Sequence, residues 1–286
     1  MEKKEILKLE ATALQIRRNI LRLIKAEAGH VGAALSSVEI LTALYFNLLR
    51  VDSKNPDWKE RDRFVLSAGH KCLALYAALA EKGFFDKSIL DTYGALDSKL
   101  PSHPDMHKLS GVETNTGALG HGLSIASGMA LGFKIEKSPA KVFVLMGDGE
   151  LAEGSNWEAA SAASMYKLDN LVVFVDRNGL QISGLTVEVM NYEPLDEKWR
   201  AFGWAVKIID GHNIETIINT VNQAPFEKGK PSVIIADTVK SKGISFAEAR
   251  ADFHNLKLNT EELELAERDF DNIEKQLKAK MKEAGL

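Results

Sequence analysis

Short apolar segments alternate with helical stretches in the second half of the chain, and this alternation constrains the fold more than any other feature. The segments are residues 142–146, 171–175, 205–209 and 233–236. Strands that are apolar on both faces are typical of parallel sheets, because helices cover both sides of such a sheet. We therefore predict an α/β fold, with a parallel β-sheet covered by helices on both faces.

Apolar residues at helical spacing predict the helices that flank these strands. Ala13, Ile16 and Ile20 begin such a pattern, and the first helix is expected to run to about residue 28, before a glycine. Further helices are predicted at residues 37–49, 71–82, 122–133 and 151–166. Residues 96–116 contain two prolines and read as an irregular loop, and loops of this length in a compact domain are often functional.

The C-terminal segment has the pattern of a separate helix. Asn259 and Glu262 have the spacing of a capping box, in which each side chain bonds to the backbone N–H of the other residue. An apolar stripe follows at helical spacing: Leu263, Ala266, Phe270, Ile273, Leu277 and Met281. We therefore divide the chain into an α/β domain, residues 1–258, and a helix within residues 259–286 that packs on this domain or on a partner.

Charge and cysteine content exclude several classes of protein. The 286 residues carry a net charge of −4 with scattered Lys and Arg, so the chain lacks the basic patch of a nucleic-acid-binding protein. No apolar run reaches the roughly 18 residues of a membrane span, and the N-terminus has no signal-peptide core. The single cysteine, Cys72, excludes an internal disulfide, and its apolar neighbours predict a buried side chain. We expect a cytoplasmic protein that binds neither nucleic acid nor membrane.

Two strand ends carry the polar residues with the clearest chemical meaning. Asp148 lies between Gly147 and Gly149, directly after the strand at 142–146, and Asn178 follows the next strand. Ligands of parallel sheets bind beyond the carboxyl ends of strands, and a right-handed crossover places these two ends side by side. A carboxylate, an amide and backbone carbonyls suit Mg²⁺ or Ca²⁺, with phosphate oxygens completing the shell. Each segment alone would also fit a tight turn.

Other ligand-binding signatures are incomplete. A phosphate-binding loop would need a lysine where Ser155 stands, and a dinucleotide fingerprint would need its third glycine where Ile125 stands. ATP and NAD are therefore disfavoured. His103 and His107 have the spacing of a zinc pair, but Pro104 between them and the missing glutamate disfavour zinc.

Histidine placement is the second signal in the sequence. Four of the seven histidines directly follow glycine: His30, His70, His121 and His212. Several of them stand where an element meets a turn, so they could gather at one rim, and His103 lies in the long loop. Any one of them alone also fits an ordinary surface or hydrogen-bonded histidine.

Taken together, these segments resemble the N-terminal, diphosphate-binding domain of transketolase, from about residue 6 to residue 254. The matching segments, in family order, are AGHVG (28–32), LSAGH (66–70), SHP (102–104), GALGHG (117–122), GDGELAEG (147–154), DRN (176–178) and TVK (238–240). The separation of Asp148 and Asn178 falls within the range typical of thiamine diphosphate enzymes. One such segment would be weak evidence for the family, but this many segments in the family order are specific to it.

The resemblance implies how thiamine diphosphate and a metal ion are held. Asp148, Asn178 and the carbonyl oxygen of Leu180 would bind Mg²⁺, for which Ca²⁺ or Mn²⁺ can substitute. The cofactor itself would contact His70, Gly117, Ala118, Leu119, Gly149, Asn178, Leu180, Lys240 and His254.

The resemblance also implies the reaction, which belongs to the pentose phosphate pathway in this family. The cofactor would take a two-carbon ketol unit from a ketose and pass it to an aldose. His30, His103 and His254 would face the sugar and act as general acids and bases. Glu153 would lie at the subunit contact, near the glutamate that activates the cofactor.

Full-length members of the family continue into a pyrimidine-binding domain and a C-terminal domain, whereas this sequence ends at Leu286. The further domains would supply the activating glutamate and the arginines that bind the substrate phosphate. We therefore expect the partner to be a separate C-terminal transketolase subunit, in an α2β2 heterotetramer that acts on sugar phosphates. A truncated or degenerate paralogue is the alternative, and the presence of both Asp148 and Asn178 disfavours it.

The sequence departs from the family at several positions. Ala118 and His121 stand where larger members often have Pro or Ser and Gln, Arg177 replaces an Asn, and Ala33 replaces a polar cofactor contact of some members. These changes leave the exact subfamily open. Two other functions remain as alternatives: an α-type subunit of a 2-oxo-acid dehydrogenase or decarboxylase, and a non-catalytic cofactor-binding scaffold. The several histidines favour sugar chemistry over oxo-acid chemistry.

Overall fold

Five strands form one sheet in the computed structural model, which describes residues 1–25, 27–255 and 257–286. The strands are β1 (Arg63–Leu66), β2 (Val142–Gly147), β3 (Leu171–Arg177), β4 (Ala205–Asp210) and β5 (Ser232–Asp237). Their order across the sheet is β1-β2-β3-β5-β4, and every neighbouring pair is parallel. The predicted parallel sheet is confirmed.

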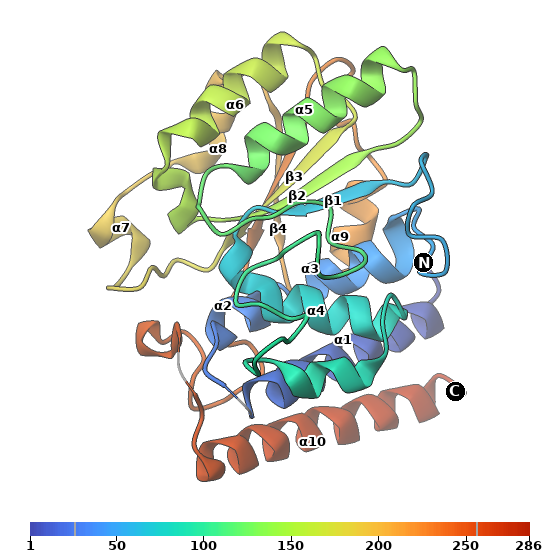
Figure 1. The fold of residues 1–286 in the computed structure, drawn as a ribbon, viewed down its shortest axis with the longest axis vertical. Helices are drawn as coiled ribbons and strands as arrows, with labels where there is room; N and C mark the ends of the chain where they lie inside the picture. The colour runs from blue at the N-terminus through green and yellow to red at the C-terminus, as the bar shows by residue number, and fades with distance from the viewer. Residues whose placement is uncertain (26, 256) are drawn as a thin grey trace.

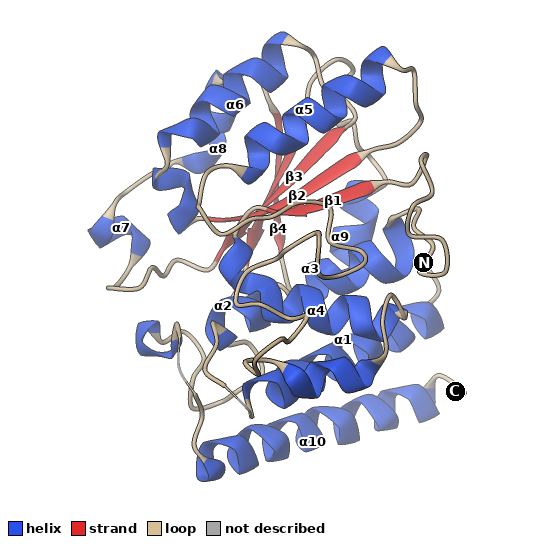
Figure 2. Ribbon diagram, viewed as in Figure 1, coloured by secondary structure: helices blue, strands red, loops and turns tan. Residues whose placement is uncertain are grey.

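Helices cover both faces of this sheet (Figures 1 and 2). On one face lie α1 (Lys3–Ile24), α2 (Val31–Ser36), α3 (Val38–Ala43), α4 (Cys72–Lys82) and α9 (Ile214–Val221). On the other face lie α5 (Gly122–Ile135), α6 (Gly154–Met165) and α8 (Leu195–Ala201). Successive side chains of a strand point to opposite faces, so Phe143 and Leu145 enter the first core while Val142 and Val144 enter the second.

Two predicted helix boundaries are wrong. The first helix, expected to reach about residue 28, ends at Ile24; residue 26 lies outside the described residues. The helix expected from residue 151 begins at Gly154, because a 3₁₀ turn precedes it. The 3₁₀ turns within the described residues are Gly69–Lys71, Lys87–Thr92, Gly149–Ala152 and Ala251–Phe253.

The helix predicted at residues 37–49 is divided into two parts. Helix α3 ends at Ala43, and a π-helical turn, Leu44–Leu48, follows it. The turn is wider than an α-helical one because the Leu49 N–H bonds to the carbonyl of Leu44, five residues earlier.

The C-terminal helix α10 (Thr260–Glu283) lies alongside α1 (Figure 1). Its predicted capping box is present: Asn259 accepts from the Glu262 N–H at 2.9 Å, and Glu262 accepts from the Asn259 N–H at 2.8 Å. Phe270 is fully buried in the core that α1 also lines. The helix therefore packs on the α/β domain, one of the two arrangements expected from its apolar stripe.

Two further expectations concern the long loop and the cysteine. Residues 96–116 form the predicted irregular loop, with neither helix nor strand. Cys72 is buried at the start of α4, as predicted, and burial raises the pKa of its thiol to about 12. Among the described residues, none of the helices is both long enough and apolar enough to cross a membrane.

Candidate active site

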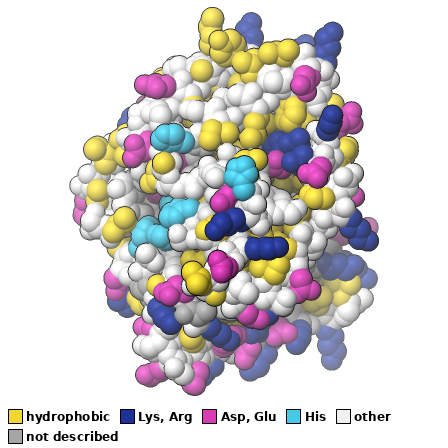
Figure 3. Space-filling view, in the orientation of Figure 1, with side chains coloured by type: hydrophobic (Ala, Val, Ile, Leu, Met, Phe, Trp, Pro, Cys, Tyr) yellow, Lys and Arg dark blue, Asp and Glu magenta, His cyan; other side chains and the backbone are white. Residues whose placement is uncertain are grey.

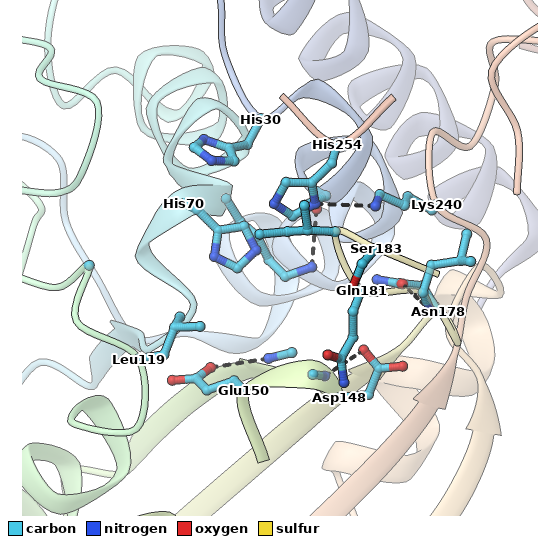
Figure 4. Close-up of a pocket in the computed structure, with 17 residues that line it drawn as sticks. His30, His70, Leu119, Asp148, Glu150, Asn178, Gln181, Ser183, Lys240 and His254 are labelled. Carbon is cyan, nitrogen blue, oxygen red and sulfur yellow. Dashed lines mark hydrogen bonds between the residues drawn. The ribbon is translucent and has the colours of Figure 1, made fainter. Parts of the chain in front are cut away.

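A cavity of about 350 Å³ opens at the carboxyl edge of the sheet, where β2 and β3 end (Figure 4). The side chains that define its chemistry come from distant parts of the sequence: His30, His70, Asp148, Asn178, Lys240 and His254. Gly147 pairs with Asp176 across the two strands, so the loops that follow β2 and β3 leave the sheet side by side. The two loops converge as the sequence predicts.

Asp148 joins the two loops through its carboxylate. Its Oδ1 accepts a hydrogen bond from the Gly149 N–H at 2.9 Å, and its Oδ2 accepts one from the Gly179 N–H at 2.7 Å. The Oδ1 of Asn178 accepts a bond from the Leu180 N–H at 3.1 Å, which turns the second loop back toward the cavity. Asp148, Asn178 and Leu180, the three predicted metal-binding residues, all line the same cavity.

The residues around Asp148 offset the negative charge of its carboxylate only in part. Burial, and to a lesser degree the nearby Asp176, raises the pKa of Asp148 to about 6. A cation at this carboxylate would offset that cost. The described residues contain no group of three His, Cys, Asp or Glu side chains of the kind a zinc site needs. A carboxylate, an amide and a backbone carbonyl instead suit a hard cation that completes its shell with phosphate oxygens.

Lys240 brings positive charge to the same cavity. It is only 1% exposed, and its Nζ lies 3.1 Å from Nδ1 of His254. Burial, and then repulsion by Lys71, lowers the pKa of Lys240 to about 8. Gln181 also lines the cavity, and its buried Nε2 has no hydrogen-bond partner among the described residues. A buried ammonium and an unpaired amide donor both favour an anion beside them.

Histidine rings cluster at the cavity, above Asp148 in the view of Figure 4. The ring centroid of His30 lies 5.4 Å from that of His70, 6.1 Å from that of His103 and 5.2 Å from that of His254. Histidines also reach the surface on the face shown in Figure 3. Burial lowers the pKa of His70 to about 2 and that of His254 to about 4, and it also lowers the pKa of His30. These three rings are therefore neutral near pH 7.

We predict that the isolated chain loses stability between pH 7 and pH 5 because of His70. In the unfolded chain this histidine binds a proton near pH 6.5, whereas in the folded chain it stays neutral at both pH values. The contribution of neutral His70 to the free energy of unfolding is therefore present above pH 6.5 and decreases below it. At pH 5 the decrease is about 2 kcal/mol. Urea unfolding at the two pH values measures the loss, which should be smaller in His70→Gln. An equal loss of stability in the unchanged chain and in His70→Gln would show that His70 is not its cause.

Comparison with known proteins identifies the family. Residues 14–279 match the family described as transketolase, thiamine diphosphate binding domain. The chain belongs to the transketolase family. A 6-deoxy-6-sulfo-D-fructose transketolase subunit of Clostridium sp. is 48% identical over 254 residues, which cover 87% of this chain and 92% of that protein. One subunit of the apulose-4-phosphate transketolase of Phocaeicola vulgatus is 46% identical over 274 residues, which cover 94% and 97%.

Single-chain transketolases are more than twice as long as the region they share with this chain. Human transketolase is 38% identical over 282 residues, which cover 98% of this chain and 44% of that protein. The crystal structure of transketolase from Campylobacter jejuni matches with a TM-score of 0.85 and 32% identity, covering 95% of this chain and 43% of that one. The predicted fold is thus confirmed, and the chain is one subunit of a transketolase, which is an enzyme of the transferase class.

The remaining predicted residues of this transketolase subunit do not all reach the cavity. Gly117 and Leu119 line it, whereas Ala118 between them is exposed and is not part of the lining. Glu153 is also exposed and lies outside the cavity, next to Gly120, where a partner can contact it.

Not all the histidines that follow glycine reach this site. His121 is exposed at the start of α5, where its Nδ1 lies 3.1 Å from the carbonyl oxygen of Leu119. His212 contacts Glu39 instead of the cavity. The expected common rim therefore includes His30 and His70 but neither of these two. His103 lies beside His30 without lining the cavity itself.

Two buried charged residues of the candidate site were not predicted from the sequence. Lys71 lines the cavity and forms an ion pair with Asp176 at 2.6 Å. Glu150 accepts bonds from the Gly120 N–H at 2.9 Å and from the Gly147 N–H at 3.2 Å, and it connects two of the family segments. The position of both residues beside family segments could have indicated them. Lys71 directly follows His70, and Glu150 directly follows the Gly-Asp-Gly segment. Gln181, Ile182 and Ser183 also line the cavity.

Proposed function

We propose that this chain transfers a two-carbon ketol unit from a ketose to an aldose, together with a separate C-terminal transketolase subunit. The observation that carries the proposal is a cluster of neutral histidine rings beside a cavity that also contains Asp148 and Lys240. Neutral imidazoles can both donate and accept hydrogen bonds, which suits the hydroxyl groups of a sugar.

The polar residues of the cavity fit the two cofactors expected for the family. Asp148, Asn178 and the Leu180 carbonyl would hold Mg²⁺, and Ca²⁺ or Mn²⁺ would accept the same oxygen donors. The residues placed to hold the diphosphate are His70, Gly149, Lys240 and His254. Thiamine diphosphate, when bound, supplies the nucleophilic carbon that adds to a ketose carbonyl.

His30, His103 and His254 would bind the substrate hydroxyls and transfer their protons. Burial keeps the pKa of His30 and His254 below the ordinary value, so both are free bases near pH 7. A free imidazole accepts a hydroxyl proton at one ring nitrogen and returns it from the same position later in the reaction. The rings of His30 and His254 lie near each other on one side of the cavity (Figure 4).

Apolar side chains are exposed where the partner would cover them. Ile182, Val187 and Met190 are 73%, 53% and 51% exposed, in the segment that contains α7 (Thr186–Val189). This segment stands away from the sheet (Figure 1). Exposed apolar groups gathered in this way mark interaction sites. We place the C-terminal subunit here, with Glu153 at the same contact, in an α2β2 heterotetramer.

The donor is proposed to be a ketose that carries a phosphate or a sulfonate. One similar protein is named for 6-deoxy-6-sulfo-D-fructose and another for apulose-4-phosphate. These names differ in the sugar and in the anionic group, and both sugars carry an anion.

Reconstitution tests the proposed function. This chain and its C-terminal partner are purified separately, mixed with thiamine diphosphate and MgCl₂, and assayed with ketose phosphates, with 6-deoxy-6-sulfo-D-fructose and with pyruvate. We expect two-carbon transfer to an aldose only in the mixture, and no reaction with pyruvate. Decarboxylation of pyruvate would support a 2-oxo-acid enzyme instead. Unchanged activity after both His103→Ala and Asp148→Ala would support a non-catalytic role.

A methyl group at Gly117 is expected to displace His103. Gly117 has φ of +149°, and an added Cβ would lie 2.9 Å from Cδ2 of the His103 ring. Gly117→Ala should therefore lower turnover of the reconstituted enzyme by roughly 10- to 100-fold, as misplaced catalytic groups do. The control is Gly128→Ala in α5, where an added Cβ would meet no atom of the described residues within 4 Å. Equal turnover in the two variants would refute the positioning of His103 by Gly117.

A further inference from the structure

A buried polar network lies beside Lys240 and takes no part in the site described above. Its centre is Glu39 of α3, which is 8% exposed. Oε1 of Glu39 lies 2.6 Å from Nη2 of Arg17, and Oε2 lies 2.9 Å from Nδ1 of His212. Arg17 comes from α1 and His212 from the loop between β4 and α9, so the network joins three elements that are distant in sequence.

The network holds the backbone on both sides of Lys240. Nε2 of His212 accepts a hydrogen bond from the Val239 N–H at 2.8 Å, which leaves the ring proton on Nδ1, where it is donated to the carboxylate. Nε of Arg17 donates to the carbonyl of Lys242 at 3.2 Å. The Glu39 carboxylate therefore orients both His212, which binds the backbone before Lys240, and Arg17, which binds the backbone after it.

The backbone between these two bonds is strained. Ser241 has φ of +62°, in the left-handed region that residues other than glycine seldom adopt. Such a conformation costs about 1–3 kcal/mol and persists only where the surrounding structure holds it. The Ser241 N–H bonds to the Gly32 carbonyl at 2.9 Å, but the buried Ser241 Oγ has no hydrogen-bond partner among the described residues. If the flanking bonds were lost, this segment would relax and Lys240 would move with it.

We propose that Glu39, acting through His212 and Arg17, positions Lys240 for the cofactor diphosphate. Glu39, His212 and Arg17 do not line the cavity, so they are positioning residues rather than catalytic ones. Burial acts to raise the pKa of Glu39, but Arg17 and His212 outweigh it and lower that pKa, which keeps the carboxylate charged. The inference rests on the proposed role of Lys240 at the diphosphate.

A double-mutant cycle between His212 and Lys240 tests the proposal. The dissociation constant of thiamine diphosphate is measured by calorimetry in MgCl₂ with the chain reconstituted with its partner subunit. Lys240→Met should weaken binding about 10- to 100-fold, as expected for one charge-assisted hydrogen bond. His212→Phe should weaken binding about tenfold, because the Val239 N–H loses its acceptor. His212→Gln should restore binding, since a glutamine amide can accept from Val239 and donate to Glu39.

The double variant separates positioning from general destabilisation. If His212 acts through Lys240, then His212→Phe with Lys240→Met should bind no more weakly than Lys240→Met alone. Losses that multiply would overturn the proposal, as would unchanged binding in His212→Phe. If Lys240→Met itself leaves binding unchanged, the proposed role of Lys240 fails, and this result is distinguishable from failure of the network alone.

A matched pair of glutamates provides a second test, which also serves if His212→Phe does not fold. The side chains of Glu39 and Glu113 are 11% and 10% exposed, and each pairs with an arginine. Glu113 pairs with Arg61 at 2.8 Å, before the start of β1, and does not line the cavity. Glu39→Gln should weaken cofactor binding, whereas Glu113→Gln should affect only the melting temperature. Equal effects of the two variants on cofactor binding would count against the network.

Discussion

Replacing Asp148 with alanine is expected to abolish the binding of thiamine diphosphate and, with it, turnover of the reconstituted enzyme. Asp148 is the only carboxylate among the three proposed metal-binding residues, and its Oδ2 also holds the Gly179 N–H at 2.7 Å. The variant therefore loses both the metal's anionic ligand and the bond that joins the two loops. Affinity should fall more than about 100-fold, because even an outer residue of a metal site is worth 10- to 100-fold.

Calorimetry with thiamine diphosphate and MgCl₂ measures this loss, and Asp148→Asn separates charge from shape. The asparagine keeps one oxygen but not the negative charge, so it should also bind the cofactor weakly. Asp237→Asn is the control, because Asp237 lies at the carboxyl end of β5, pairs with Arg177 and does not line the cavity. If Asp148→Ala and Asp237→Asn bind thiamine diphosphate equally tightly, the metal lies elsewhere.

Replacing Lys71 with methionine is expected to cause the largest loss of stability. Lys71 and Asp176 form an ion pair at 2.6 Å with side chains that are 1% and 0% exposed. Removal of one partner leaves the other charge buried and unpaired, which typically costs about 3–5 kcal/mol. Asp148 lies close enough for Asp176 to raise its pKa, so an unpaired Asp176 would add further repulsion at the site.

Urea unfolding at pH 7 measures the effect of Lys71→Met. The double variant Lys71→Met with Asp176→Asn should recover part of the loss, because neither charge then remains buried. An exposed pair provides the control: Arg22 and Asp91 have side chains that are 35% and 57% exposed, and Arg22→Met should cost no more than about 1 kcal/mol. Similar losses for Lys71→Met and Arg22→Met would show that burial of the first pair is unimportant.

Local sequence patterns were sufficient for β2, β3, β4 and β5, but not for β1 or for every helix boundary. Residues 142–146 and 171–175 are apolar at each position, and they form β2 and β3 because such segments must be covered on both faces. The turn types at Leu44–Leu48 and Gly149–Ala152 were missed. Over a single turn, the apolar spacing of α-, π- and 3₁₀-helices is too similar to distinguish them.

Part of the site was predictable for the same local reason. Asp148 and Asn178 follow consecutive apolar strands, and parallel strands linked by a helix present their carboxyl ends at one edge. Lys240 and His254 were predicted only from the family resemblance, since nothing in their immediate neighbours indicates a ligand. Ala118 was predicted in the same way and is exposed outside the cavity lining.

The sequence by itself determined the four strands β2 to β5, several of the helices, and which strand ends carry Asp148 and Asn178. Only the tertiary structure decided that β5 lies between β3 and β4, which brings Lys240 beside the loop of Asn178. It also decided that Lys71 pairs with Asp176 and that Glu39 holds His212. The reason is physical: apolar periodicity records whether a side chain is buried, whereas its partner depends on how distant elements pack.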